Sequence, residues 1–183
     1  GNHLLGRVID SLGRPVDGRS LHCSNLTPQY SGRLIAPLDR NPISKSLDVG
    51  VRAINGTLTL AKGQRVALIA GSGVGKSTLL GMMTRQTRAD VVVVALIGER
   101  GREAGEFISE ILGPSGLEKS VVVLATSDAT SVMRRRAADT AHLIAEYFRD
   151  QGKDVLLLCD SLTRVAHAQR EIGLAAREPP TSK

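Results

Sequence analysis

The chain has 183 residues, 42% of them hydrophobic and 23% charged, which is enough for one domain with a sizeable core or slightly more than one. No apolar run approaches the ~18 residues of a membrane span, and the first residues show no signal-peptide pattern. The two cysteines, Cys23 and Cys159, match no metal or redox spacing. We therefore expect a reduced cytosolic protein. The formal net charge of +6 allows anionic partners, but the basic residues are dispersed apart from 134–136 and aromatic residues make up only 2% of the chain, so we do not expect nucleic-acid binding.

The first 60 residues differ in pattern from the rest of the chain. Residues 6–19 read as short strands separated by Gly and Pro turns, and residues 26–44 read as an extended lead-in. We therefore expect a short β-rich segment before the main domain.

From about residue 60 the sequence alternates between short apolar runs and amphipathic stretches. The runs are almost purely aliphatic, which is typical of parallel strands that are buried on both faces. The longest amphipathic stretch ends at Gly152, a residue type that commonly stops helices. The pattern predicts an α/β fold with a mostly parallel sheet and helices on both faces. The expected strands are 64–70, 91–97, 120–126 and 154–160, and the expected helices are 76–86, 102–113, 131–152 and 161–176.

The stretch AGSGVGKST (70–78) lies between an expected strand and an expected helix, as a phosphate-binding Walker A loop requires. Its glycines let backbone N–H groups surround phosphate oxygens, Lys76 would reach the β- and γ-phosphates, and the Ser77 hydroxyl would bind Mg²⁺. Ala70 replaces the usual first glycine of the motif, and Gly71 can relieve the turn. The alternative is a chance Gly-rich turn. The expected phosphate-binding residues are Gly71, Ser72, Gly73, Val74, Gly75, Lys76, Ser77 and Thr78.

A carboxylate stands at the end of the last expected strand. Asp160 follows the apolar run VLLLC, which is the position of a Walker B acid that serves Mg²⁺. The alternative reading makes Asp160 an N-cap for a helix that begins at Ser161, and both roles are compatible. Cys159 reads as a packing residue rather than a ligand.

The strand VVVVALI (91–97) is followed abruptly by the charged stretch GERGRE. The ordinary interpretation is a solvated turn. In a parallel sheet that carries a phosphate loop, however, Glu99 would face the γ-phosphate and could orient and polarise an attacking water. We expect Arg100 and Arg102 to keep Glu99 ionised. The sequence predicts a catalytic carboxylate at Glu99.

These motifs resemble the type III secretion ATPases, a family that comprises the injectisome ATPase and its flagellar export counterpart and is related to the rotary ATP synthase β subunit. The likeness spans essentially the whole chain from GRVIDSLGRPVDG onward, and EYFRDQGK and REIGLAA look more like the injectisome branch. It is carried by LDVGVRAINGTLTLAKGQR, GSGVGKSTLLGMM, ALIGERGREAGEFI, ATSD and IAEYFRDQGKDVLLLCDSLTRVAHAQREIGLAAREPP.

The resemblance implies a RecA-like P-loop NTPase fold that binds ATP or ADP with Mg²⁺. By the family pattern, Lys76 neutralises the γ-phosphate, and Ser77 and Asp160 serve Mg²⁺. Glu99 matches the catalytic glutamate, Arg100 lies beside it, and Arg164 approaches the γ-phosphate site.

The resemblance also implies a domain organisation and a quaternary assembly. Residues 1–30 match the end of an N-terminal β-barrel and its linker, and residues 31–183 match a RecA-like ATP-binding domain that is truncated on its C-terminal side. The arginine finger, the adenine-packing aromatic region and a C-terminal helical domain are expected beyond Lys183, so we expect the chain alone to be weakly active. The parent is expected to form a homo-hexameric ring at the cytoplasmic face of the inner membrane, with peripheral membrane association at most. Its expected partners are stator and stalk proteins and chaperone–substrate complexes of an export apparatus.

Other functions remain open at this point. A flagellar export ATPase or a rotary ATP synthase catalytic subunit would keep the same motifs. A RecA-like RNA helicase or terminator would need an RNA-binding OB domain and basic central loops, which the chain does not show. A non-catalytic nucleotide-binding ring subunit would lack the catalytic glutamate, so Glu99 counts against it.

Overall fold

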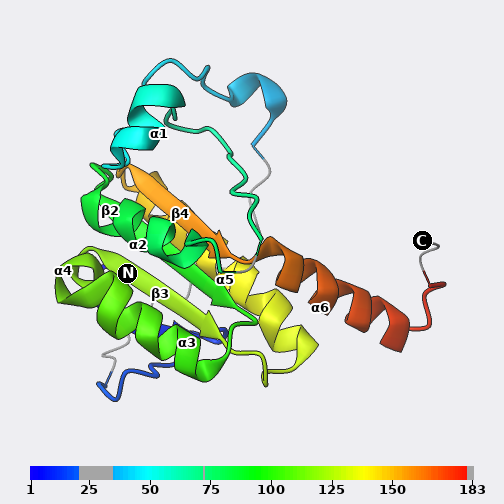
Figure 1. The fold of residues 1–183 in the computed structure, drawn as a ribbon. Helices are drawn as coiled ribbons and strands as arrows, with labels where there is room; N and C mark the ends of the chain where they lie inside the picture. The colour runs from blue at the N-terminus through cyan, green and yellow to red at the C-terminus, as the bar shows by residue number, and fades with distance from the viewer. Residues whose placement is uncertain (21–34, 72, 181–183) are drawn as a thin grey trace.

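The computed structural model describes residues 1–20, 35–71 and 73–180 (Figure 1). Within this part of the chain, four parallel strands form one sheet in the order β1-β3-β2-β4. Val94 in the centre of the sheet lies opposite Val122 of β3 on one side and Leu158 of β4 on the other. The strands are β1 (Arg7–Asp10), β2 (Val91–Ile97), β3 (Ser120–Ala125) and β4 (Val155–Asp160).

The helices match the expected stretches, with additions. The expected helices at 76–86, 131–152 and 161–176 are confirmed, whereas the one at 102–113 is in fact two segments followed by a third, unexpected helix. The expected boundary between a β-rich unit and the main domain, near residue 30, lies outside the described residues. The helical segments are η1 (Asn2–Leu4), η2 (Pro37–Asp39), α1 (Arg52–Thr57), α2 (Lys76–Gln86), α3 (Gly101–Glu106), the π-helix η3 (Phe107–Leu112), α4 (Gly113–Glu118), α5 (Ser131–Asp150) and α6 (Leu162–Ala175).

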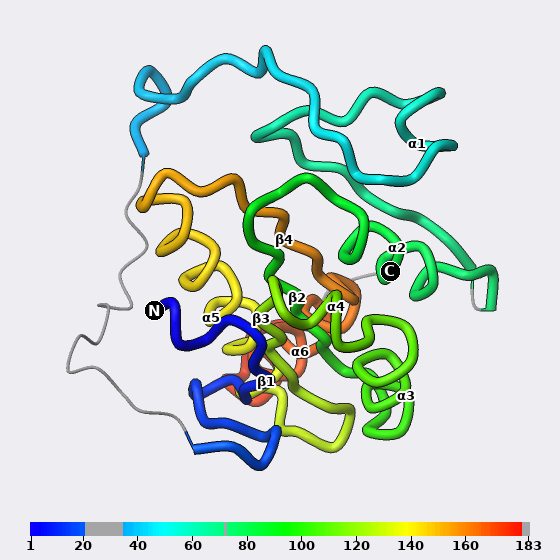
Figure 2. The backbone as a smooth tube through the Cα atoms, turned by 90° about the vertical axis from the view of Figure 1, so that its left-hand side faces the viewer, coloured from blue at the N-terminus to red at the C-terminus, as the bar shows by residue number. Residues whose placement is uncertain are grey.

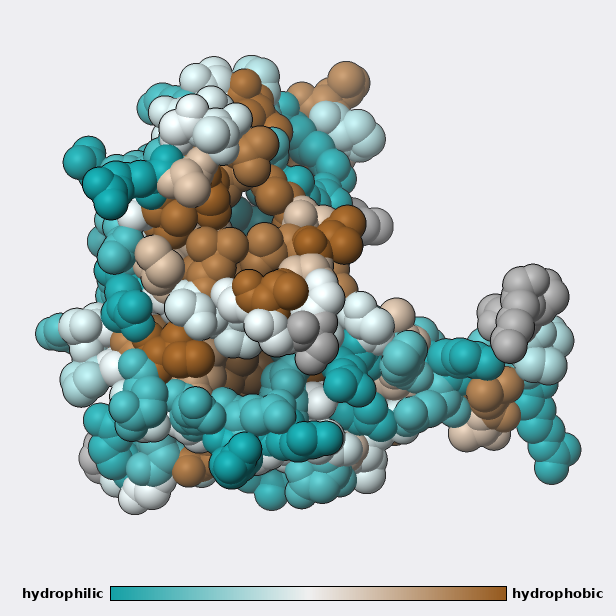
Figure 3. All heavy atoms as spheres, in the orientation of Figure 1, coloured by the Kyte–Doolittle hydropathy of each residue, from teal (hydrophilic) through white to brown (hydrophobic). Residues whose placement is uncertain are grey.

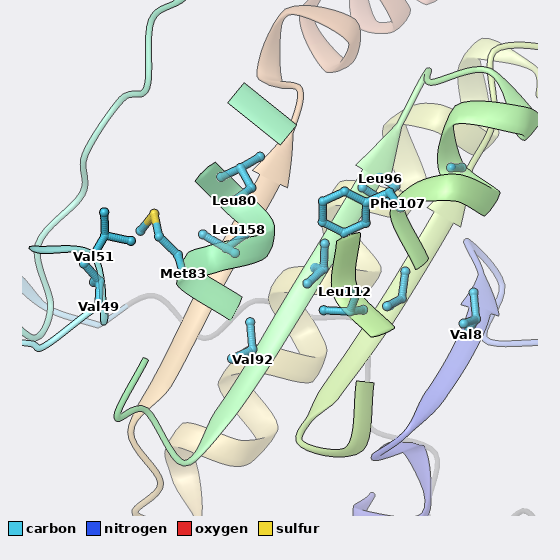
Figure 4. Packing of buried hydrophobic residues seen from close by; sticks show 13 residues of the cluster. Val8, Val49, Val51, Leu80, Met83, Val92, Leu96, Phe107, Leu112 and Leu158 are labelled. Atoms are coloured by element: carbon cyan, nitrogen blue, oxygen red, sulfur yellow. The ribbon is translucent and has the colours of Figure 1, made fainter. Parts of the chain in front are cut away.

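Helices cover both faces of the sheet, as the aliphatic strands predicted. Side chains of a strand alternate between its two faces, so each strand supplies apolar groups to two separate cores. On one face, Val92 and Leu96 pack with residues of α2, α3 and η3, among them Phe107 (Figure 4). On the other face, Val93 packs with the apolar side of α5, which includes Phe148. The sheet is therefore held rigidly from both sides, with its strand ends at one edge.

The π-helix η3 lies against the middle of α2. A Cβ atom built on Gly81 of α2 would stand 2.1 Å from Cγ2 and 3.2 Å from the carbonyl oxygen of Ile111 in η3. Only glycine fits this approach, since real Cβ contacts are longer. The two helical segments that flank the strand ends are thus packed against each other.

The strand predicted for residues 64–70 is wrong, because this segment pairs with no described strand. Its apolar residues are exposed, with Val66 at 58% and Ile69 at 93%. The segment lies on the β4 side of the molecule, away from β1 (Figure 2), and Lys62 just before it forms an ion pair with Asp154. Hydrophobic side chains gather on this face between α1 and α2 (Figure 3). A strand is stable only with a hydrogen-bonded neighbour, and hydrophobic pattern alone does not reveal whether that neighbour is present.

Helix α6 leads away from the sheet (Figure 1). Arg134 of α5 holds it through an ion pair with Glu171, with 2.7 Å between Nη2 and Oε2. Among the described residues, no helix is both long enough and apolar enough to cross a membrane.

We expect Gly81→Ala to destabilise the protein by about 1–3 kcal/mol, because the new methyl group would overpack the contact with Ile111. The matched control is Gly56→Ala in α1, where an added Cβ would meet no atom within 4 Å. The control should leave the free energy of unfolding unchanged or raise it slightly, since alanine favours helices. Urea unfolding of both variants measures the difference, and equal effects would contradict the close packing of α2 on η3.

Candidate active site

Two strand ends bring acidic residues to the same edge of the sheet. Leu96 of β2 lies opposite Asp160 of β4, so Glu99, three residues past Leu96, surfaces beside Asp160. A cavity of about 210 Å³ opens between these ends and helices α2 and α3. It is lined by Ser77, Leu96, Glu99, Glu103, Ala104, Glu106, Phe107, Ile111 and Asp160.

The phosphate loop lies next to this cavity, and it is exposed. Gly73 and Gly75 have φ angles of +76° and +94°, which other residues rarely adopt, and they turn the chain into α2. The first N–H groups of α2 have no partner within the helix, so they are available to an anion. Gly71, Val74 and Thr78 are exposed beside them. Ser72 lies outside the described residues.

Lys76 and Ser77, the first two residues of α2, reach the strand ends. The Lys76 ammonium donates to the carboxylate of Asp160, whose side chain is 4% exposed. A buried carboxylate needs such a partner because burial without one is costly. The alternative that Asp160 caps α6 is wrong, since the N-cap residue is Ser161 and Asp160 ends β4.

Glu99 is half-buried and lines the cavity, so it is not a freely solvated turn residue. Burial, and then the charge of Asp160 and a hydrogen bond with Glu103, raise the pKa of the Glu99 carboxyl, while the charge of Lys76 opposes this shift. Such a carboxyl is a stronger base when ionised than an exposed glutamate.

The prediction that Arg100 and Arg102 keep Glu99 ionised is wrong. The Arg100 side chain is 82% exposed, and its Nη1 lies 3.5 Å from Oε1 of Glu103. Arg102 is exposed as well. Arg100 is the N-cap residue of α3, and its guanidinium pairs with Glu103, which lines the cavity, and not with Glu99. The cation that faces Glu99 is Lys76.

Arg164, in the first turn of α6, lies over Gly98, the residue just before Glu99. A Cβ atom at Gly98 would stand 2.8 Å from Cβ and 2.9 Å from Cγ of Arg164, so the arginine stem needs a glycine there. Gly98 also has a φ angle of +76°. This contact brings Arg164 next to the backbone that carries Glu99. Arg164 itself is exposed to solvent.

The donors at this edge fit a magnesium ion. The described residues contain no group of three or more His, Cys, Asp or Glu side chains that could hold a metal alone. Ser77 and Asp160 both line the cavity and offer one hydroxyl and one carboxylate. Mg²⁺ prefers one or two such protein oxygens together with phosphate oxygens and water. Cys159 does not compete, because burial and then the charge of Asp160 raise its thiol pKa to about 11.

Glu103 and Glu106 also line the cavity, and the sequence motifs pointed to neither residue. The signal for Glu103 was its spacing. It lies at the start of the predicted helix 102–113, four residues after Glu99, and is therefore close in sequence to the end of the strand that leads to Glu99. Glu106 carries no comparable signal.

Comparison with known proteins finds relatives that cover the whole chain. The model of the ATP synthase alpha/beta family, nucleotide-binding domain, matches residues 50–183. The flagellum-specific ATP synthase of Pseudomonas aeruginosa is 60% identical over 184 residues, which cover 100% of this chain and 41% of that protein. The type 3 secretion system ATPase of Xanthomonas euvesicatoria is 54% identical, again over 100% of this chain and 41% of that protein.

Solved structures show the same fold. The assembled ATPase EscN of the enteropathogenic E. coli type III secretion system superposes with a TM-score of 0.92 at 49% identity, covering 100% of this chain and 44% of EscN. A prototypical ATPase from the type III secretion system of pathogenic bacteria gives a TM-score of 0.90 at 49% identity, covering 99% of this chain and 52% of that one. The expected RecA-like α/β fold is thereby confirmed. The chain spans less than half the length of the two curated relatives.

Proposed function

The chain belongs to the ATP synthase alpha/beta family, whose nucleotide-binding domain it carries, and from this premise we propose that it binds ATP with Mg²⁺ and hydrolyses it to power protein export by a type III secretion system. One observation carries the proposal: a phosphate loop with Lys76 and Ser77 shares a single cavity edge with Glu99 and Asp160. Relatives named for type 3 secretion and for the flagellum support the cellular role.

In the proposed complex, the phosphates lie against the loop formed by Gly71–Thr78. Backbone N–H groups and the N-terminus of α2 bind the phosphate oxygens. Lys76 exchanges its contact with Asp160 for a contact with the γ-phosphate, which leaves the Asp160 carboxylate available. Ser77 and Asp160 would then hold Mg²⁺, which supplies charge neutralisation at the phosphates.

For hydrolysis, one water molecule lies between the Glu99 carboxylate and the γ-phosphorus. Glu99 orients this water and accepts its proton while the oxygen bonds to phosphorus and the bond to the β–γ bridging oxygen breaks, which releases ADP and phosphate. The cavity walls of Leu96 and Phe107 limit the access of other water. Arg164 and Arg100 supply positive charge at the entrance, and Arg164 is the better placed because it packs over Gly98.

The whole parent is proposed to work as a homo-hexameric ring. EscN, with which this chain shares its fold, is described as an assembled ATPase and in a complex with its central stalk EscO. We extend that assembly to this protein, at the cytoplasmic face of the inner membrane, with stator proteins and chaperone–substrate complexes as further partners. Residues 1–30 would lead from an N-terminal β-barrel into the sheet, which they join through β1, and each neighbour in the ring would supply an arginine finger to the adjoining site.

A flagellar export ATPase is the second candidate, because the flagellum-specific relative in Pseudomonas aeruginosa is 60% identical and the type 3 secretion relative 54%. The chemistry is the same in both cases. A rotary ATP synthase subunit and a non-catalytic ring subunit receive less support, since these relatives are named for the flagellum and for type 3 secretion, and Glu99 lines the cavity.

We expect Lys76→Ala to weaken ATP binding by roughly 10- to 100-fold, because a hydrogen bond to a charged group contributes about 1.5–3 kcal/mol. Titration calorimetry with Mg·ATP measures the affinity. Lys62→Ala is the matched control, because Lys62 pairs with Asp154 away from the cavity, and it should bind like wild type. Equal affinity of wild type and Lys76→Ala would remove the phosphate-loop assignment.

Glu99→Gln should lower the turnover of the full-length protein by roughly 100-fold or more, the scale for losing a positioned base. Nucleotide affinity should change little, because the glutamine keeps the shape of the side chain in the cavity. Phosphate release and calorimetry measure the two quantities separately. Unchanged turnover would return Glu99 to a structural role.

Complementation separates the two export systems. The full-length gene is expected to restore effector secretion in a host that lacks its injectisome ATPase, and to leave a host that lacks its flagellar ATPase non-motile. The Glu99→Gln gene serves as the inactive control in both hosts. Restored motility without restored secretion would establish the flagellar alternative.

A further inference from the structure

Helix α6, which carries Arg164 in its first turn, has a small apolar contact with the rest of the protein. The structure describes the whole helix, and within it only Ala168 and Gly173 are buried. Val165 is partly buried and packs against the core on the α5 face of the sheet. Because so little apolar surface fixes α6, its orientation relative to the sheet depends on its polar contacts.

Glu171, two helical turns after Arg164, makes a polar contact of this kind with α5. Nη2 of Arg134 lies 2.7 Å from Oε2 of Glu171, and the Ser131 hydroxyl donates to the same oxygen. Ser131 and Arg134 belong to the first four residues of α5. One carboxylate oxygen of α6 is thus held twice by the start of α5.

Arg134 is a firmly placed partner. Its side chain is 15% exposed, and its Nε donates to the backbone carbonyl of Ala129 over 3.2 Å. The N–H groups of a guanidinium point in fixed directions, so this bond also directs Nη2. Arg135, the next residue, pairs instead with Asp139 within α5. Arg134 therefore joins two helices, whereas the ion pair beside it stays on one.

Glu171 and Arg164 lie on one face of α6. They are seven residues apart, with the buried Ala168 between them, and this spacing keeps side chains on the same side of a helix. Seven residues correspond to roughly 10 Å along the helix axis. At the near end, the stem of Arg164 lies against Gly98, the residue before Glu99. Without the contact at Glu171, α6 can rotate or tilt, and Arg164 moves with it.

We propose that Glu171 is a positioning residue: its contacts with α5 fix the orientation of α6, and this holds Arg164 beside Glu99. The inference rests on the proposed function, in which Arg164 supplies positive charge at the entrance of the cavity. Glu171 touches neither the nucleotide nor the attacking water, and it acts through Arg164 alone.

The test is a double-mutant cycle in the full-length protein. Phosphate release under single-turnover conditions gives the rate and keeps slow variants measurable. Glu171→Ala should lower the rate roughly 10-fold, since misplacing a group by ~1 Å can cost about 100-fold. The same substitution added to Arg164→Ala should change the rate by less than about twofold, because the residue through which Glu171 acts is then absent.

Two further variants separate positioning from a general effect on the fold. Glu171→Gln should keep the rate within about threefold of wild type, because its amide oxygen still accepts hydrogen bonds from α5. Asp139→Ala removes the neighbouring ion pair with Arg135, which lies within α5, and should leave the rate unchanged. Glu99→Gln is the inactive reference.

The possible results distinguish this inference from the proposed function. A wild-type rate in Glu171→Ala or in Arg164→Ala, with Glu99→Gln inactive, would overturn the positioning role and leave the proposed function standing. An equal loss from Glu171→Ala in the presence and in the absence of Arg164 would also overturn it, since Glu171 would then act on the fold or on assembly. A wild-type protein that hydrolyses no ATP would overturn the proposed function and this inference with it.

Discussion

The contact between Lys76 and Asp160 determines how the phosphate loop sits on the sheet. Residues 64–70, which lead into the loop, pair with no described strand, so the loop is held mainly from the side of α2. There the Lys76 ammonium reaches the buried carboxylate at the end of β4. Lys76, which stabilises the buried Asp160 carboxylate, is thus the residue proposed to contact a phosphate. In the proposed complex, phosphate binding would draw Lys76 away and leave the Asp160 carboxylate available to a cation, so the two events would be coupled.

The second constraint is the packing of helices over the cavity. Gly81 lets the π-helix η3 approach α2, and η3 continues directly from α3, which carries Glu103. A π-turn within a helix is rare and occurs often at functional sites. Here it places Phe107 and Ile111 in the wall of the cavity that Ser77 of the phosphate loop and Glu99 also line. One packed layer therefore supports both the residues proposed to bind phosphate and the residue proposed to direct water.

Sequence reasoning succeeded where local pattern determines structure. Buried parallel strands must be aliphatic on both faces, so β2, β3 and β4 were predictable, and so was α5 from its apolar side. It failed where partners are distant in sequence. Three features depend on tertiary packing. They are the strand neighbour that residues 64–70 need, the contact between Lys76 and Asp160 across 84 positions, and the pairing of Arg100 with Glu103. The motifs named Ser77, Glu99 and Asp160, which line one cavity and whose roles stay proposals, but the electrostatics around Glu99 required the structure.

The most direct measurement of this account is a crystal structure of the protein with ADP, Mg²⁺ and aluminium fluoride, which imitates the phosphoryl group in transfer. The account predicts that Lys76 leaves Asp160 and contacts the fluoride group, that Ser77 and Asp160 face the ion, and that Glu99 holds a water in line with the bond that breaks. A Lys76 still bonded to Asp160 beside a bound nucleotide, or a nucleotide seated away from the cavity, would contradict it.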